Sequence, residues 1–131
     1  MTRELTDATG SKVFIELVDG APIRSYSIRL ASVSSPAGRA DFLEPVSDEA
    51  VRVFFHTEVD PEFSGRGLAT QLIRTALGDA IEENIVVVPV CPLFAAYLRT
   101  HGEAYLAEGG KFRVPRRADL ALVSQAVRAE R

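Results

Sequence analysis

The chain has 131 residues, 47% of them hydrophobic, which suits one globular domain with an apolar core. Its net charge of −3 argues against a nucleic-acid-binding face, and its single cysteine, Cys91, excludes an internal disulfide and a cysteine-rich zinc cluster. The sequence contains no apolar run of roughly 18–20 residues and no apolar signal core. We therefore expect a cytoplasmic protein without metal, membrane or nucleic-acid partners; the oligomeric state stays open.

The N-terminal half of the chain is rich in β-type segments. Residues 1–11 are polar and predict a flexible N-terminal tail, and residues 12–131 predict a single domain. Strands are expected over residues 12–18, 23–33, 39–46 and 51–59, separated by turn signals. Strict alternation in the last of these strands would place Val51, Val53, Phe55, Thr57 and Val59 on one face, and Arg52, Phe54, His56 and Glu58 on the other.

The second half alternates between helical and strand patterns. Apolar residues at helical spacing predict a helix from about residue 67 to 84, with Ser64 as its N-cap. Residues 85–90 (IVVVPV) predict a strand buried on both faces, and Pro92 an N1 start for a helix ending near His101. A last helix is expected over 119–129, packed on its own sheet or on a partner. This order indicates a mixed α/β layered domain.

The strongest indication of function is the Gly65-Arg66-Gly67 turn, which lies between a strand and a helix. Glycine lets the backbone approach a ligand closely, and the free N–H groups of a helix start attract anions. Arg66 adds a charged donor. A tight strand-to-helix turn is the alternative, but the strand before, the proline stop and the helix after favour a phosphate or pyrophosphate seat.

This segment resembles a known family. Glu62–Ala69 (EFSGRGLA) is similar to the acyl-CoA pyrophosphate loop of the GNAT N-acetyltransferase superfamily, although Glu62 stands where arginine or glutamine is usual. The spaced motifs HTEV, GRGLA and VVPVCPLFAAYLRTH resemble the small Yjdj-type branch of that superfamily. The resemblance covers roughly residues 12–101, so residues 102–131 form an uninterpreted C-terminal extension.

The resemblance implies a GNAT-like, mostly antiparallel twisted sheet with splayed central strands and flanking helices. The pantetheine of acetyl-CoA, as cosubstrate, would enter the gap and pair with the exposed strand edge near Glu58 and Val59. Pro89 suits the place where two strands stop pairing, because it has no N–H. The implied cofactor-binding residues are Val59, Ser64, Gly65, Arg66, Gly67, Leu68, Ala69 and Thr70.

Cys91 has two interpretations. A lone cysteine is most often a small buried hydrophobe. In the Yjdj-type branch, however, a cysteine at this position lies beside the cofactor, where the following helix or a charged His56 would make the thiol more reactive. An acetyl-cysteine intermediate is then one mechanism among those to test.

Three further residues are candidate catalytic groups. His56 and Glu58 share a strand face, which suits proton handling, and we favour His56 as general base. A polar face turned to solvent is the alternative. Tyr97 follows Cys91 on the next helix, and the resemblance implies that it could protonate the leaving CoA thiolate; packed core is its alternative role.

Together these features predict an acetyl-CoA-dependent N-acetyltransferase that acts on an unidentified primary amine by direct transfer. One alternative is a CoA-binding module without catalysis, which would need neither His56 nor Cys91. Another is ping-pong transfer through Cys91, which predicts a protein adduct of acetyl mass when no acceptor is present.

Overall fold

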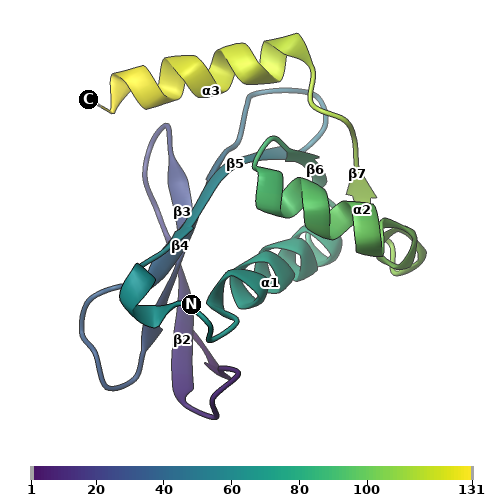
Figure 1. The fold of residues 1–131 in the computed structure, drawn as a ribbon. Coiled ribbons are helices and arrows are strands. Elements are labelled where there is room, and N and C mark those ends of the chain that lie inside the picture. Colours follow the sequence, from purple (N-terminus) through teal and green to yellow (C-terminus); the bar gives the residue numbers. More distant parts are fainter. Residues whose placement is uncertain (1, 131) are drawn as a thin grey trace.

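The computed structural model describes residues 2–130 as one seven-stranded sheet with three α-helices (Figure 1). In chain order the elements are β1 (Thr2–Thr6), β2 (Lys12–Val18), β3 (Arg24–Leu30), β4 (Gly38–Leu43), β5 (Val51–Val59), the 3₁₀ turn η1 (Pro61–Phe63), α1 (Leu68–Glu82), β6 (Val86–Pro89), α2 (Pro92–Ala107), β7 (Lys111–Phe112) and α3 (Arg117–Ala129).

The strands follow one another across the sheet in chain order. β1 to β5 form an antiparallel meander, whereas β5, β6 and β7 pair in parallel. A parallel neighbour needs a crossover, and α1 and α2 provide the two crossovers. The expected mixed, mostly antiparallel sheet with flanking helices is confirmed.

Each face of the sheet carries an apolar core. The larger core joins α1 and α2 to the strands and includes Phe54 and Phe94, whose rings stack 4.4 Å apart. A smaller core on the other face joins Val53 and Val88 to Ala126 of α3. We call these two sides the α1/α2 face and the α3 face.

Several predicted bounds are confirmed, including residues 12–18, residues 51–59 and the start of α2 at Pro92. The expectation for residues 1–11 differs from the structure, because Thr2–Thr6 forms β1 and pairs with β2. Polar side chains fit β1 because it is an edge strand with alternating half-buried positions. The pattern could not reveal the partner strand that orders this segment.

The C-terminal part also departs from prediction. His101 does not end α2, which continues to Ala107 through Gly102. Close packing favours glycine there, since a Cβ at Gly102 would lie 3.0 Å from the Phe112 ring. α3 packs on its own sheet through Ala126 and Val123.

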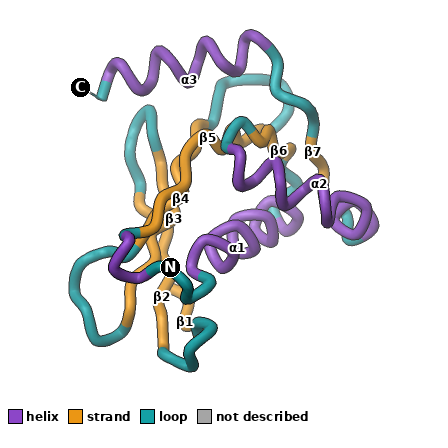
Figure 2. The backbone as a smooth tube through the Cα atoms, in the orientation of Figure 1, coloured by secondary structure: helices purple, strands orange, loops and turns teal. Residues whose placement is uncertain are grey.

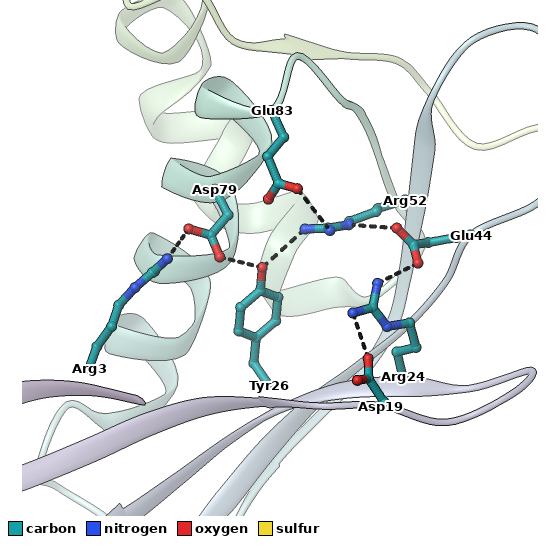
Figure 3. Close-up of polar contacts among 8 residues, drawn as sticks. All are labelled: Arg3, Asp19, Arg24, Tyr26, Glu44, Arg52, Asp79 and Glu83. Atoms are coloured by element: carbon teal, nitrogen blue, oxygen red, sulfur yellow. Dashed lines mark hydrogen bonds and ion pairs between the residues drawn. The ribbon is translucent and has the colours of Figure 1, made fainter. Parts of the chain in front are cut away.

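A chain of polar contacts crosses the α1/α2 face (Figure 3). Arg52 is 3% exposed; its Nε donates to Glu44 at 3.1 Å and its Nη1 to the Tyr26 hydroxyl at 3.0 Å. That hydroxyl donates to Asp79 of α1 at 2.6 Å, and Arg3 of β1 pairs with the same carboxylate. Burial, followed by the bond to Asp79, raises the pKa of Tyr26. The contacts therefore connect β1, β3 and β5 to α1.

Within residues 2–130, every helix is too short or too polar to cross a bilayer.

Candidate functional site

A loop of mostly exposed residues leads from η1 into the start of α1 (Figure 2). Gly67 is the N-cap of this 15-residue helix, and Gly65 and Gly67 have φ angles of +80° and +74°. L-residues with a side chain rarely adopt such angles, so glycine is what this turn requires. The first N–H groups of a helix have no acceptor within it, and those of Ala69 and Thr70 lie on a partly exposed first turn. This geometry suits an anion.

Ser64 has a different role from the one predicted. It closes η1, donating its N–H to the Pro61 carbonyl at 3.2 Å, and Gly67 takes the N-cap position. The prediction of Ser64 as N-cap is therefore wrong. The Gly65-Arg66-Gly67 turn separates Ser64 from the helix, and Ser64 contributes to the loop as an exposed residue.

Arg66 is tied to the N-terminal hairpin. Its guanidinium lies 3.2 Å from Asp7, and its carbonyl accepts the N–H of Ala8 at 2.9 Å. Burial alone would raise the pKa of Asp7, but hydrogen bonds from Thr9, Ser11 and Arg66 outweigh it and lower that pKa to about 2. The β1–β2 turn thus holds the glycine loop in place, and Arg66 already has an anionic partner.

We expect Asp7→Asn to destabilise the protein at neutral pH but not at low pH. The folded pKa lies near 2 and the unfolded one near 3.8, so the stabilisation is fully present above about pH 5 and is lost as the pH falls toward 2. Denaturant unfolding of both proteins across this range measures the difference. Asp48→Asn, at an exposed position, serves as control. A pH-independent gap between wild type and Asp7→Asn would contradict the assignment.

The second feature of the site is a split in the sheet. The last residues paired between β5 and β6 are Phe54 and Pro89, after which the Cys91 N–H still donates to the Phe54 carbonyl at 2.8 Å. Within residues 2–130 the remainder of β5, residues 55–59, lacks a strand partner on this side. The splayed strands and the terminal position of Pro89 agree with the sequence prediction.

The open edge of β5 offers main-chain groups. Asp60 donates its N–H to the Ala37 carbonyl on the β4 side at 2.7 Å. Because peptide groups alternate in direction along a strand, those of Val59 and Thr57 are directed to the open side. The peptide group of Glu58 is directed to β4, so only Val59 of the two expected positions lies at the open edge.

Cys91 lies at this split. It is 2% exposed, it is the N-cap of α2, and its Sγ lies 3.3 Å from the Thr57 hydroxyl. The sequence analysis did not identify Thr57, because strict alternation placed it on the face away from Phe54.

A β-bulge explains that error. Asp41 pairs with His56 but the next residue, Phe42, pairs with Phe54, so Phe55 is an extra residue in β5. One inserted residue reverses the faces beyond it. The prediction that Phe54 shares a face with His56 and Glu58 is therefore wrong.

His56 and Glu58 are together, as expected, but on the α3 face. His56 Nε2 lies 3.1 Å from Glu58, which also pairs with Arg39 at 2.5 Å. The bond from His56, followed by the charge of Arg39, lowers the pKa of Glu58. Cys91 lies on the opposite, α1/α2 face. The prediction that a charged His56 activates the thiol is therefore wrong, because His56 pairs with Glu58 instead.

Tyr97 occupies a third location. Its ring lies 4.4 Å from that of His101, and the two line a groove between α1 and α2 with Arg74 and Gly78. It is half-buried on the α1/α2 face, the side on which α1 begins.

Fold and site together define an α+β domain with an exposed helix start, suited to an anion, beside a split sheet. The chain belongs to the GCN5-related N-acetyl-transferase family, whose model matches residues 25–108. No curated protein matches the chain.

Three solved structures are similar in outline. A ribosomal-protein-alanine N-acetyltransferase from Brucella melitensis biovar Abortus 2308 is 14% identical with a TM-score of 0.46, over 82% of this chain and 64% of that one. An aminoglycoside acetyltransferase from an uncultured soil metagenomic sample, in complex with trehalose, is 14% identical with a TM-score of 0.46, over 66% and 59%. An aminoglycoside N-acetyltransferase in complex with CoA is 19% identical with a TM-score of 0.42, over 75% and 65%. The chain spans less than two thirds of each.

Proposed function

We propose that this protein transfers an acetyl group from acetyl-CoA to a primary amine. The observation that carries the proposal is the split between β5 and β6 beside the exposed start of α1. A helix start suits the pyrophosphate, and an unpaired strand edge suits an extended amide chain such as pantetheine. Family membership supports the same reading.

Binding would use main-chain groups for the most part. The loop residues Ser64, Gly65 and Gly67 and the first turn of α1, with Leu68, Ala69 and Thr70, would hold the pyrophosphate. Val59 would pair with the pantetheine at the open edge. Arg66 would contribute through its backbone and by holding the loop, since its side chain is bonded to Asp7.

Transfer would use groups from both faces of β5, with the cofactor on the α1/α2 face and the base on the α3 face. The amine nitrogen attacks the thioester carbonyl, its proton leaves to a base, and the carbon–sulfur bond breaks to give the amide and CoA thiolate. His56 is our candidate base: in the tautomer whose Nε2–H donates to Glu58, Nδ1 can accept the proton. A main-chain N–H at the open edge would stabilise the oxyanion.

Two further residues complete the proposal. Tyr97 is our candidate donor of a proton to the leaving thiolate, which its place on the α1/α2 face allows. Cys91 would lie near the thioester, held by Thr57. We favour direct transfer over an acetyl-cysteine intermediate, because the base is on the opposite face from the thiol.

We also propose that the chain belongs to the small Yjdj-type branch of the family.

Thermal unfolding with acetyl-CoA, CoA and NAD tests the cofactor. A ligand at about 100 times its Kd adds roughly 2.7 kcal/mol of stability, and we expect this from both CoA species but not from NAD. Gly65→Asp should abolish the effect, because it adds a negative charge to the phosphate seat. Its matched control is Gly109→Asp at the end of α2, where φ is also positive at +97°.

Both aspartate variants carry the same added charge and a similar backbone strain of roughly 1–2 kcal/mol. Loss of the ligand effect in Gly65→Asp alone therefore supports the seat. If CoA still stabilises Gly65→Asp, the cofactor must bind at a site other than the glycine loop. If the wild type responds to neither CoA species, the proposed function fails.

A further inference from the structure

The α3 face carries a groove of about 670 Å³ between the sheet and α3, within the range of small-molecule sites. One wall is apolar and consists of Ile23, Phe55, Val123 and Val127. The rest of the lining includes the polar residues Arg39, Asp41, His56 and Glu130. A second hollow of about 480 Å³ continues from it along Ser25 and Arg39 to Glu58.

The groove lies where a second substrate would have to enter. α1 begins on the α1/α2 face, so a cofactor held there would approach the open edge of β5 from that side. The other side of the same strand segment is the α3 face, to which the bulge directs His56. An acceptor that enters through the groove would therefore contact His56, the candidate base, before it reaches the open edge of β5.

The charges of the groove select the class of acceptor. Among the described residues that line the two hollows, three carboxylates, those of Asp41, Glu58 and Glu130, accompany one guanidinium, that of Arg39. This guanidinium already pairs with Asp41 at 3.0 Å and Glu58 at 2.5 Å. A cation is attracted to such a surface, whereas a carboxylate on the acceptor would meet a guanidinium that is already paired.

We propose, on the basis of the proposed function, that the acceptor is a small primary amine on an apolar alkyl or arylalkyl body. The ammonium group lies toward His56 and the carboxylates, and the body lies against Val123 and Val127 of α3. α3 begins at Arg117, beyond the residues 25–108 that the family model matches. The C-terminal extension is thus the element that determines acceptor specificity.

A graded set of amines tests the class. Across ethylamine, butylamine and hexylamine, kcat/KM should rise roughly two- to fourfold for each added methylene, because each buries apolar surface in the groove. 2-Phenylethylamine should match hexylamine. 6-Aminohexanoate, which ends in a carboxylate, should fall to the ethylamine level or below. Spermidine and a peptide with a free N-terminus represent the polycation and peptide alternatives.

Val127→Asn tests the position of the body. It should lower kcat/KM for hexylamine about tenfold, with ethylamine and the acetyl-CoA thermal shift unchanged. Its matched control is Leu120→Asn on the same helix, at a side chain that is 50% exposed and outside the groove lining. Val123→Ala, which keeps an apolar side chain, provides a second variant should Val127→Asn melt early.

Each outcome decides the inference. A chain-length trend that Val127→Asn removes supports it. A flat trend, a preference for spermidine or the peptide, equal losses in both asparagine variants, or acetyl-CoA binding without transfer to any of these amines overturns it. Absence of acetyl-CoA stabilisation in the wild type would instead refute the proposed function.

Discussion

Replacing Arg52 with alanine is expected to lower the free energy of unfolding by about 3 kcal/mol. The side chain is 3% exposed, bonds Tyr26 and Glu44, and lies 4.9 Å over the Phe42 ring. Alanine removes these contacts and leaves a cavity between β5 and α1. For a chain of this size the melting temperature should fall by roughly 10–15 °C.

The value lies at the low end for a buried ion pair because its acidic partners are not buried. Glu44 and Glu83 keep side-chain exposures of 37% and 55%, and Glu44 also retains Arg24 at 2.5 Å. Water can therefore solvate the Glu44 and Glu83 carboxylates when the guanidinium is removed. Arg52→Met, which fills the volume without the charge, should cost only about 1 kcal/mol.

Arg29→Ala is the control for Arg52→Ala. Arg29 also stacks on a phenylalanine, Phe14, at 4.8 Å, but from a partly exposed position on β3. Its loss should cost less than about 1 kcal/mol. Chemical denaturation of the four proteins gives the comparison. Equal losses for the two alanine variants would show that the polar contacts across the α1/α2 face contribute little.

Local patterns in the sequence were sufficient where short-range chemistry decides the structure. The bounds of β5, the Pro92 helix start and the glycine turn depend on a residue's own backbone preferences and its near neighbours. The exposed helix start followed from the same reasoning and suggested a phosphate seat. The split sheet and the place of Pro89 in it were implied by the resemblance to the GNAT superfamily.

The rest depends on contacts between distant parts of the chain. β1 looks like a tail until β2 pairs with it, and the extra residue Phe55 exists only relative to β4. That one residue decides that Thr57 meets Cys91 while His56 faces α3. The assignment of groups to the two faces of β5 therefore could not be predicted from alternation alone.

His56→Gln is expected to lower kcat for amine acetylation by about a hundred- to ten-thousandfold, the range that a general base contributes. Glutamine keeps a polar side chain of similar size and can still bond Glu58, but it cannot accept the proton of the amine. Stabilisation by acetyl-CoA should be unchanged, because the cofactor seat lies at the start of α1. The remaining activity should rise with pH, since unassisted transfer depends on the fraction of acceptor that is already deprotonated.

His101→Gln is the matched control, because it changes the other histidine, which is exposed on α2. Because its ring contacts that of Tyr97 at 4.4 Å, it tests a neighbour of the candidate acid, and its effect on kcat should be far smaller than that of His56→Gln. Steady-state kinetics with hexylamine from pH 6 to about pH 9, together with thermal shifts for all three proteins, separates chemistry from binding. If His56→Gln keeps wild-type kcat and pH profile, the His56–Glu58 pair is only a polar surface contact. The base would then have to be sought among the other groups that border the open edge of β5.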